Sequence, residues 1–494
     1  MKHDLFPSLG ACKKLAARGN LIPVYKEIVA DTETPVSTFM KLAGDEPYSC
    51  LLESVEGGER WGRYSFIAWA PKRVFISKGN RFSVGAPGAE PRWQATQDPL
   101  AALQKVMAGF KPVEVEGLPR FWGGAVGCTA YDTVRFIEEL PHRPPEQVSV
   151  PDMLFFITDR LVIFDHLSHT VKILTCVETD GPGGLAKRYA AANADIDRII
   201  ARLRAPLRMP ATRVCRRHPQ KSNMTPAAYC RIVETAKEHI RAGDIIQVVP
   251  SQRFSRTTDA APFDIYRALR MVNPSPYLYH FSAGDFAVIG SSPELLVRKE
   301  GDHAETRPIA GTRPRHSDPA VEEGLARELL ADPKERAEHI MLVDLGRNDL
   351  GRVCKPGSVT VPELMIIEKY SHVMHIVSSV AGTLKPGVDA FELFRSCFPA
   401  GTVSGAPKVR AMQIIDELEP SARGIYAGAI GYFSYSGNMD MAIAIRTIVL
   451  KDTTAYAQAG AGIVADSVPL NEHLETKNKA AALFAALDKA EAGL

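Results

Sequence analysis

The chain contains 494 residues, of which 45% are hydrophobic and 23% are charged, and its formal net charge at pH 7 is +2. These values are typical of a large globular protein, and the near balance of charge argues against a nucleic-acid or membrane-surface partner. No apolar run reaches the roughly 18 residues that a membrane span needs, and residues 1–20 lack the apolar stretch of a secretory signal. The eight cysteines form no CxxC pair, which favours free thiols and a cytoplasmic location.

The first part of the chain is predicted to combine short strands with a long helix. β-Branched or aromatic runs bounded by turn residues predict strands at residues 73–77, 154–158 and 161–164. Apolar residues spaced near 3.6 predict a helix at residues 184–203.

Residues 205–225 are rich in proline and arginine and have little apolar periodicity, so we expect an exposed connector there. The connector separates an N-terminal region, residues 20–204, from a C-terminal region, residues 226–490. Directly after it, Thr225 and a proline predict a helix start, and Gly243 predicts its end.

Strands and helices continue to alternate in the C-terminal region. Apolar or alternating runs predict strands at residues 245–250, 373–381, 443–450 and 456–461. Apolar periodicity predicts further helices at residues 332–344 and 470–483. We find no internal repeat, and the predicted fold class is α/β or α+β with much sheet.

Two of these helices carry paired carboxylates. Glu335 and Glu338 share one helix face, and Glu472 and Glu475 repeat the same spacing. If the two helices converge, their oxygens would suit Mg²⁺, which prefers oxygen ligands. The alternative is a pair of solvated faces with i,i+4 ion pairs.

Two glycine-rich segments could bring backbone amides to a ligand. Residues 398–408 precede a helix expected to start near Ala406, and helix starts bind anions well. This segment lacks the Lys-Ser/Thr ending of a phosphate loop, which argues against nucleotide binding. Residues 459–463 offer a second approach site, and at both segments the alternative is a tight turn or close packing.

Two polar side chains interrupt apolar runs. Arg446 lies in the predicted strand 443–450, where a guanidinium needs a partner such as a carboxylate, from a ligand or from the protein itself. His375 lies in the predicted strand 373–381, where it is either a catalytic group or a satisfied core residue. Together these signals suggest a site for a small polycarboxylate.

Four longer motifs identify a family. The segments Gly290–Glu294, Asp344–Asp349, Phe398–Lys408 and Glu472–Lys479 resemble the chorismate-utilising enzymes, and the match is closest to the anthranilate synthase component I group. It extends from about Ile22 to Leu483. The resemblance implies a large sandwich of mainly antiparallel sheets with outer helices, in which the N-terminal and C-terminal regions interlock into one unit.

Two positions indicate the reaction within that family. Ala310 stands where many aminodeoxychorismate synthases have a nucleophilic lysine, so covalent attack on chorismate is excluded. Gln247 stands where the water-using relatives have a lysine base, and an amide cannot activate water in that way. The resemblance therefore implies direct attack by ammonia, giving anthranilate and pyruvate through aminodeoxyisochorismate, the first step of tryptophan biosynthesis.

The resemblance also implies roles for individual residues. Glu338 and Glu475 would bind Mg²⁺ directly, and Glu335 and Glu472 would hold its waters. Glu294 would donate a proton to the leaving hydroxyl. The remaining candidates, which would hold chorismate or act at its C2, are Gly311, Thr312, His375, Thr402, Tyr426, Arg446, Gly460, Ala461, Gly462 and Lys479.

The N-terminal region is implied to carry a feedback site for tryptophan. The first part of that site would be Glu53, Ser54 and Arg63, and the second part Pro276, Tyr277 and Leu278. Polar groups of the first part would bind the head of the amino acid, and the second part would pack against its indole.

The resemblance implies a partner as well. No amidotransferase domain follows the last predicted helix, so we expect a separate glutamine amidotransferase subunit that supplies ammonia within a heterotetramer. The alternatives are aminodeoxychorismate synthase component I, a phenazine-pathway relative, and a tryptophan-binding regulatory protein without catalysis. The last would have a broken metal or carboxylate site, which the sequence argues against.

Overall fold

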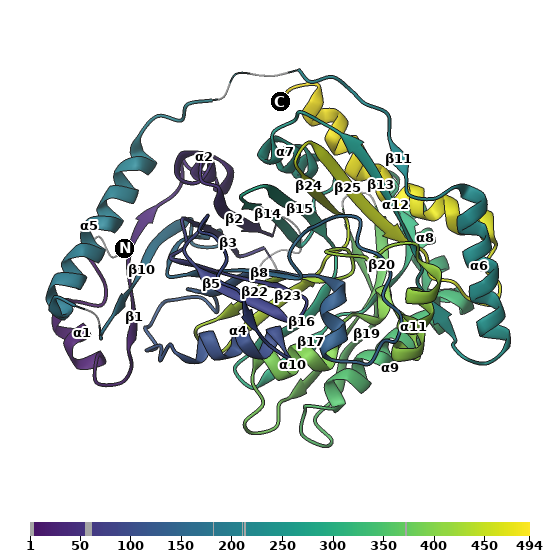
Figure 1. Cartoon of the computed structure of the whole chain (residues 1–494), viewed down its shortest axis with the longest axis horizontal. Helices are drawn as coiled ribbons and strands as arrows, with labels where there is room; N and C mark the ends of the chain where they lie inside the picture. Colours follow the sequence, from purple (N-terminus) through teal and green to yellow (C-terminus); the bar gives the residue numbers. More distant parts are fainter. Residues whose placement is uncertain (1–3, 55–61, 181, 210, 212–213, 371–372) are drawn as a thin grey trace.

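The computed structural model describes residues 4–54, 62–180, 182–209, 211, 214–370 and 373–494. Two large antiparallel sheets dominate the molecule, and helices cover them (Figure 1). The expected fold class, a mainly antiparallel sandwich with outer helices, is confirmed.

The first sheet has 11 strands, and neighbours within it come from both sequence regions. In spatial order its strands are β1 (Leu21–Val29), β10 (Thr170–Glu178), β9 (Arg160–Asp165), β3 (Tyr64–Trp69), β2 (Tyr48–Glu53), β14 (Tyr277–Ala283), β15 (Phe286–Ser292), β24 (Thr447–Lys451), β25 (Thr454–Gly460), β13 (Ser251–Thr257) and β11 (Lys221–Ser222).

The second sheet has 12 strands and is mixed in the same way. In spatial order its strands are β18 (Ile309–Pro314), β20 (Val373–Thr383), β17 (His303–Thr306), β16 (Leu295–Glu300), β23 (Met439–Ile443), β22 (Ala429–Ser434), β7 (Gly124–Thr129), β8 (Met153–Thr158), β4 (Arg73–Lys78), β5 (Arg81–Gly85) and β6 (Gln94–Ala95), with β19 (Thr360–Lys369) beside β20. A separate pair joins β12 (Gln247–Val248) to β21 (Gly405–Ala406).

Helices connect and cover the sheets. They are α1 (Leu9–Leu15), α2 (Pro35–Leu42), α4 (Pro99–Ala108), α5 (Gly184–Arg204), α6 (Pro226–Arg241), α7 (Pro262–Val272), α8 (Pro319–Ala331), α9 (Pro333–Gly351), α10 (Ala390–Cys397), α11 (Lys408–Leu418) and α12 (Pro469–Glu491), with single-turn 3₁₀ segments at Tyr131–Phe136 and Gly401–Val403. Among the described helices none is long and apolar enough to cross a bilayer.

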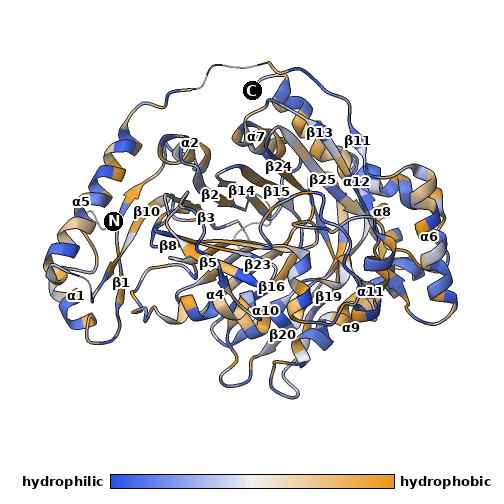
Figure 2. Cartoon of the chain, in the orientation of Figure 1, coloured by the Kyte–Doolittle hydropathy of each residue, from blue (hydrophilic) through white to orange (hydrophobic). Residues whose placement is uncertain are grey.

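Side chains alternate between two cores, as the pleat of a strand requires. Along β9, Leu161 and Ile163 face the core between the sheets, whereas Val162 and Phe164 face a second core beneath the helices α5, α7 and α12. Apolar colour accordingly concentrates on the strands and on one side of the covering helices (Figure 2). Strands such as β9 read as continuous apolar runs because both of their faces are buried.

Most predicted elements are present, and two differ. The predicted strand 443–450 is two strands, β23 and β24, separated by a turn at Ala444–Arg446. The predicted strand 245–250 shrinks to the two residues of β12. The expected connector 205–225 contains β11 near its end, and residues 210, 212 and 213 within it lie outside the described part of the chain.

Candidate active site

Helices α9 and α12 carry the predicted glutamates in their first two turns. Asp332 caps α9, because its carboxylate accepts hydrogen bonds from the first-turn amides of Lys334 and Glu335. Lys334 lies within electrostatic range of both Glu335 and Glu472, so the first turns of the two helices are neighbours.

Each glutamate pair is a local excess of negative charge. Burial raises the pKa of Glu335, and the neighbouring Glu338 carboxylate raises it further. Burial likewise raises the pKa of Glu472, and Glu475 adds to that effect. Both pairs would therefore gain from a nearby cation.

Gln247 connects α9 to the end of β25. Its amide Nε2 donates a 2.8 Å hydrogen bond to Glu338 Oε1. A Cβ on Gly462 would lie 2.8 Å from that Nε2 and 3.6 Å from Glu338 Oε1, so only glycine fits there without displacing the contact.

Lys479 connects α12 to the same strand end. Its ammonium donates to the Gly460 carbonyl at 3.0 Å and pairs with Glu475 at 2.7 Å. The glycines at the end of β25 thus lie between Glu338 on one side and Glu475 on the other. Among the described residues no group of three or more Asp, Glu, His or Cys side chains is gathered tightly enough to hold a metal alone.

Two of the three predicted amides in this segment are already engaged, and the Gly460 N–H is one of them, because it donates to the Tyr426 hydroxyl oxygen. The Ala461 N–H donates to the Pro250 carbonyl at 3.2 Å, and its side chain is buried in a small core cluster. Gly460 and Ala461 are therefore unavailable as hydrogen-bond donors to a ligand, which corrects the expectation for these two residues.

His375 lies near the start of β20, and hydrogen-bond partners on β18 hold its imidazole ring in place. Its Nδ1 lies 2.8 Å from the Gly311 carbonyl oxygen and 3.1 Å from Thr312 Oγ1. A carbonyl oxygen only accepts, so Nδ1 carries the proton and Nε2 keeps its lone pair. Burial lowers the pKa of His375, and the cations Arg446 and Lys479 lower it further. The ring is thus a neutral base at neutral pH.

Gly311 makes this arrangement possible. It has φ +65° within an irregularity of the β18–β20 ladder, and a Cβ there would lie 3.0 Å from Glu335 Oε2. The backbone bend points the Gly311 carbonyl at His375 and leaves Ala310 and Thr312 on opposite sides of it.

Arg446 lies in the turn between β23 and β24 with φ 51°, rather than on a strand as predicted. Its side chain forms no ion pair and no hydrogen bond with any residue of the described chain. Burial lowers the pKa of Arg446, and Tyr426 is the neighbour that offsets this. A half-buried guanidinium without an acid is well suited to an anionic ligand.

Tyr426 lies beside Arg446 and the end of β25. A Cβ on Gly460 would lie 2.9 Å from its hydroxyl oxygen, so the two groups are in close contact. Burial raises the pKa of Tyr426 to about 12, so its phenol is a neutral hydrogen-bond donor.

Glu294 lies between β15 and β16, where it is 6% exposed. Burial raises its pKa to about 8, although Thr402 and Lys479 both act to lower it. The Thr402 hydroxyl is next to the carboxyl without the alignment of a full hydrogen bond. Glu294 is therefore largely protonated at pH 7, as a general acid must be.

A pocket of about 60 Å³ is lined by most of the residues that were predicted to bind tryptophan. Ser54, Tyr277 and Pro276 line it, together with Glu53 and Leu278. Two of these side chains also make contacts outside the pocket. The Glu53 carboxylate accepts hydrogen bonds from Tyr266 and Arg270 of α7, and the Leu278 side chain belongs to the core beneath α7.

Sequence reasoning missed the charged wall of this cavity and misplaced one arginine. Asp440 binds Arg298 at 2.8 Å and Arg120 at 3.3 Å, so one carboxylate faces two guanidinium groups. Tyr277 donates its hydroxyl to the same carboxylate at 3.0 Å. Arg63 does not line the cavity, and it pairs with Asp165 at 2.9 Å instead. The three charges come from distant strands, so no local motif could have indicated them.

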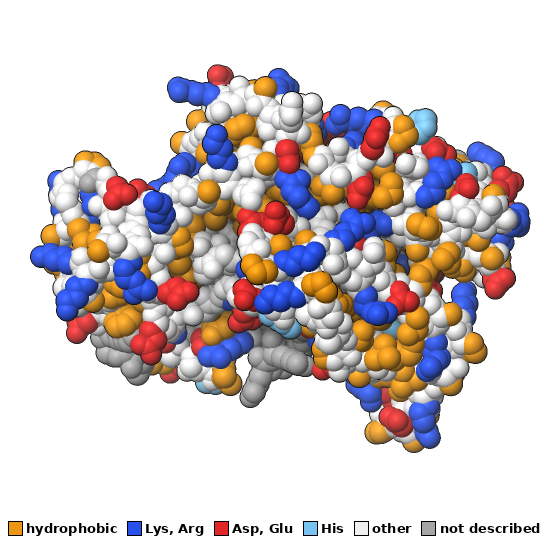
Figure 3. Space-filling view, turned by 90° about the horizontal axis from the view of Figure 1, so that it is seen from below, with side chains coloured by type: hydrophobic (Ala, Val, Ile, Leu, Met, Phe, Trp, Pro, Cys, Tyr) orange, Lys and Arg blue, Asp and Glu red, His pale blue; other side chains and the backbone are white. Residues whose placement is uncertain are grey.

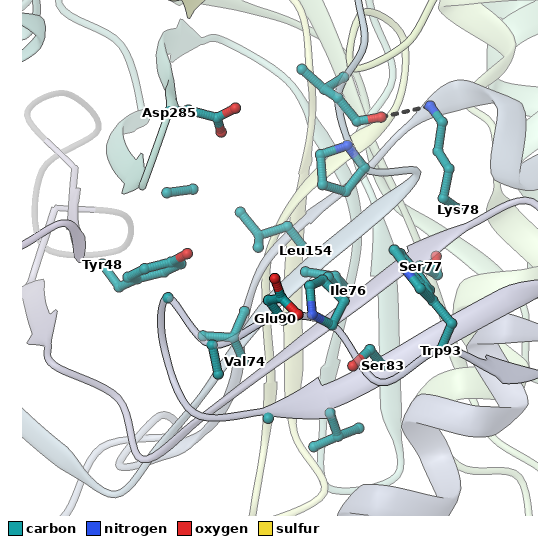
Figure 4. Close-up of a pocket in the computed structure, with 18 of the residues that line it drawn as sticks. Tyr48, Val74, Ile76, Ser77, Lys78, Ser83, Glu90, Trp93, Leu154 and Asp285 are labelled. Atoms are coloured by element: carbon teal, nitrogen blue, oxygen red, sulfur yellow. Dashed lines mark hydrogen bonds between the residues drawn. The ribbon is translucent and has the colours of Figure 1, made fainter.

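A larger cavity of about 680 Å³ lies between the sheets at the β4–β5 hairpin (Figure 4). Tyr48 and Asp285 enter from the first sheet, and Ile76 and Ser77 from the second. Lys78 donates to the Val150 carbonyl at 2.6 Å, which fixes it at the rim. The lining is mixed, and its Asp285 and Lys451 side chains already pair with each other, so volume alone does not make it the active site.

Surface charge does not indicate another site. On the face shown in Figure 3, basic and acidic side chains are interspersed and no region of one sign dominates. This agrees with the formal net charge of +2.

The sequence matches the family model described as chorismate binding enzyme over residues 48–485. It is 48% identical to anthranilate synthase component 1 of Aquifex aeolicus (strain VF5) over 488 residues, which cover 98% of each chain. It is also 48% identical over 487 residues to the protein of the same name from Pseudomonas putida, with 97% of this chain and 98% of that one covered.

Solved structures agree. The crystal structure of anthranilate synthase component I from Streptococcus pneumoniae TIGR4 superposes with a TM-score of 0.77 at 38% identity, and the match covers 92% of this chain and 98% of that one. The isochorismate synthase MenF from Escherichia coli superposes with a TM-score of 0.71 at 18% identity, covering 97% and 98%. At that identity the likeness shows the fold alone.

Proposed function

The chain belongs to the chorismate binding enzyme family, and we propose that it is the chorismate-converting subunit of an anthranilate synthase. The observation that carries this proposal is the Arg446 guanidinium, which has no acidic partner in the described part of the chain and lies in electrostatic range of His375. Chorismate has two carboxylates on a polar ring, so it supplies the missing anion. The reaction is chorismate plus ammonia to anthranilate, pyruvate and water.

Chorismate binds with its two carboxylates at opposite walls of the site. Arg446 and the Tyr426 hydroxyl hold the enolpyruvyl carboxylate, and the Gly462 amide is the remaining donor from the end of β25. The ring carboxylate faces the glutamates of α9 and α12. Thr402 and the Gly311–Thr312 backbone line the ring.

The two glutamate pairs fit a magnesium ion at the ring carboxylate. Their donors are carboxylate oxygens, which Mg²⁺ prefers, and burial together with the neighbouring carboxylate raises the pKa of Glu335 and of Glu472. Glu338 and Glu475 are the candidates for direct ligands, and Glu335 and Glu472 for ligands through water. Bound Mg²⁺ would supply neutralisation and orientation of a carboxylate.

In the first step ammonia attacks C2 of the ring. The ring double bonds shift, the bond from C4 to its hydroxyl oxygen breaks, and Glu294 gives its proton to that oxygen, which leaves as water. The new ammonium group on C2 loses one proton. The product at this stage is aminodeoxyisochorismate.

In the second step His375 removes the proton from C2 with Nε2, the atom left unprotonated by the hydrogen bond of Nδ1 to Gly311. The bond between C3 and the enolpyruvyl oxygen breaks, and the enol takes a proton to become pyruvate. The ring becomes aromatic, which makes this step irreversible.

Two side chains favour ammonia over other nucleophiles. Ala310 has no amine with which to attack chorismate, so a covalent intermediate is not available. The Gln247 amide is occupied by Glu338 and has no basic lone pair at neutral pH, so it does not activate water. These residues argue against aminodeoxychorismate synthase chemistry and against isochorismate synthase chemistry.

Ammonia comes from a partner subunit with glutaminase activity. A glutaminase nucleophile is a cysteine whose pKa is lowered. Burial instead raises the pKa of six of the eight thiols here, namely those of Cys12, Cys50, Cys128, Cys176, Cys354 and Cys397. We place the enzyme in the cytoplasm, where these free thiols stay reduced.

The purified chain is therefore expected to form anthranilate from chorismate, Mg²⁺ and ammonium, and to form none from glutamine. The test is a product assay by anthranilate fluorescence, with chromatography to detect a 4-amino product. Adding a glutaminase component should restore glutamine use. A 4-amino product would favour aminodeoxychorismate synthase, and turnover of glutamine by the chain alone would contradict the two-subunit proposal.

The pocket lined by Ser54, Tyr277 and Asp440 is the proposed tryptophan site. Arg120 and Arg298 line it beside Asp440, and Arg120 also lies 3.7 Å from Glu300, so these guanidinium groups are the candidates to bind the carboxylate of an amino acid. Tyr277 and Pro276 supply apolar surface for the indole. Coupling to catalysis requires two arrangements with different affinities for each ligand. The strand β16 joins the two sites, because Arg298 lies four residues after Glu294.

Replacing Arg120 by Gln should raise the tryptophan concentration needed for half inhibition by about tenfold or more, since a charge-assisted hydrogen bond contributes about 1.5–3 kcal/mol. The measurement is anthranilate formation against tryptophan concentration. Arg63→Gln is the matched control, because Arg63 pairs with Asp165 outside the cavity. Loss of inhibition in the Arg63 variant alone would place the inhibitor elsewhere.

A further inference from the structure

A small pocket of about 40 Å³, with room for water, lies beside Glu294 and Thr402, and its other polar side chains serve none of the roles described so far. It is enclosed by β16, α9 and the segment between α10 and α11. Most of its lining is apolar, and its polar side chains are Glu294, Thr306, Arg307, Asp349 and Thr402. Two motifs of the family resemblance therefore meet here, one ending at Asp349 and one ending at Lys408.

Asp349 is 5% exposed and is held by one of its two oxygens only. Its Oδ2 accepts a 2.7 Å hydrogen bond from the Lys408 ammonium, which also lies 3.4 Å from the Cys397 carbonyl oxygen. Its Oδ1 is buried and has no hydrogen-bond partner among the described residues. Burial raises the pKa of Asp349, and Lys408 opposes this. A buried carboxylate oxygen in this state needs a water molecule or a proton.

Two hydroxyl groups share the cavity. Thr306 is 7% exposed, and its Oγ1 is also buried without a hydrogen-bond partner in the described chain. A Cβ on Gly346 would lie 3.0 Å from that oxygen, so the glycine keeps this wall open. Thr402 Oγ1 lies next to the Glu294 carboxyl. Hydroxyls donate and accept at once, so they can pass protons between carboxyl groups.

The proposed reaction requires Glu294 to be reprotonated after each turnover. Each turnover removes one proton from Glu294 and creates one water molecule beside it. Glu294 is buried, so while the product fills the site the direct route for a new proton is through neighbouring groups of the protein.

Given the proposed function, on which this inference rests, we propose that the cavity receives the water formed from the 4-hydroxyl and relays a proton to Glu294 from the Lys408–Asp349 pair. The Glu294 carboxyl gives its proton to the departing oxygen. Lys408 gives one proton to the Asp349 carboxylate, which becomes a neutral carboxyl group. That carboxyl group then gives a proton to the chain formed by the threonine hydroxyls and the new water, and this chain delivers a proton to Glu294. Solvent reprotonates Lys408, and the proton released by the new amine balances the cycle.

A purely structural role for Asp349 would give different results. In that case the carboxylate only anchors Lys408 and so fixes the segment 398–407. Its loss would then disturb chorismate binding and stability, and it would leave the pH dependence of turnover in place.

The test is Asp349→Asn, with Thr306→Val as a second variant of nearly equal size. We expect kcat of Asp349→Asn to fall about tenfold or more at pH 8, with KM for chorismate within about twofold of the wild type. The alkaline limb of the kcat profile should move to lower pH, and the solvent deuterium effect on kcat should rise. Thr306→Val should change the same quantities in the same direction by less.

Asp344→Asn is the matched control, because Asp344 lies on the same helix, is 60% exposed and pairs only with Arg347 among the described residues. An unchanged pH profile and deuterium effect in Asp349→Asn would overturn the relay, whether kcat falls or not. A rise in KM alone would also overturn it. The wild-type chain is assayed with ammonium before any variant. If it forms no anthranilate, the proposed function itself fails, and this failure is distinct from a failure of the relay.

Discussion

Glu294→Gln should lose a factor of about 10² to 10⁴ in turnover and gain stability at neutral pH. The glutamine has nearly the same shape but carries no acidic proton for the departing hydroxyl. Burial raises the pKa of Glu294 from 4.5 to about 8, so wild-type kcat should fall as the pH rises above about 8. The variant should lack this part of the profile.

The stability gain follows from the same shift. Between pH 4.5 and 8 the unfolded chain ionises Glu294 and the folded chain does not, so the free energy of unfolding declines with rising pH over that window. At pH 7 the cost is about 3 kcal/mol, and a neutral glutamine removes it. Thermal unfolding of both proteins from pH 5 to 8 measures the difference.

Glu300→Gln is the control, since Glu300 ends the same strand β16 and its side chain is 62% exposed. It should change neither turnover nor the pH dependence of unfolding. Glu294→Gln with wild-type kcat would exclude the residue as the acid. Equal stability curves would show that Glu294 is ionised in the folded state.

Local sequence patterns predicted most of the helices and strands correctly. The helix expected at residues 184–203 is α5, because an apolar stripe at helical spacing can pack only as a helix against a sheet. The strands around residues 154–164 were equally clear, because both of their faces are buried and the runs are wholly apolar.

The turn at Arg446 could not be predicted in the same way. Residues 441–450 are apolar apart from Arg446 and Thr447, so they resemble one uninterrupted strand. The structure breaks the run at Arg446, which adopts φ 51°. A left-handed arginine is uncommon, and such strain is typical of functional sites. Its charge within an apolar run marked Arg446 as a candidate site residue, but nothing in the local sequence indicated its backbone conformation.

Contacts between distant segments were invisible to local patterns. Gln247 reaches Glu338 across 91 positions, and Tyr277 reaches Asp440 across 163. Residue types at helical spacing indicated the glutamate pairs, but only the fold shows that the end of β25 lies between them. The charged wall of the tryptophan cavity has no sequence signal for the same reason.

Replacing either Glu338 or Glu475 by Gln should remove most turnover, by a factor of about 10² or more, without unfolding the protein. The Gln side chain keeps the size, and at position 338 its carbonyl oxygen can still accept the hydrogen bond from Gln247. What is lost is the negative charge that a divalent ion requires of its ligands. Glu335→Gln and Glu472→Gln should have smaller effects, because these residues are assigned to the ion through water.

Activity against Mg²⁺ concentration and thermal unfolding test this assignment together. In the wild type, Mg²⁺ and chorismate added together should raise the melting temperature more than either does alone, since each stabilises the site for the other. The Glu338 and Glu475 variants should lose that joint increase. Glu234→Gln, an exposed position on α6, should keep it. Wild-type turnover in either metal variant would separate the glutamates from the reaction, and the ring carboxylate would then need another partner.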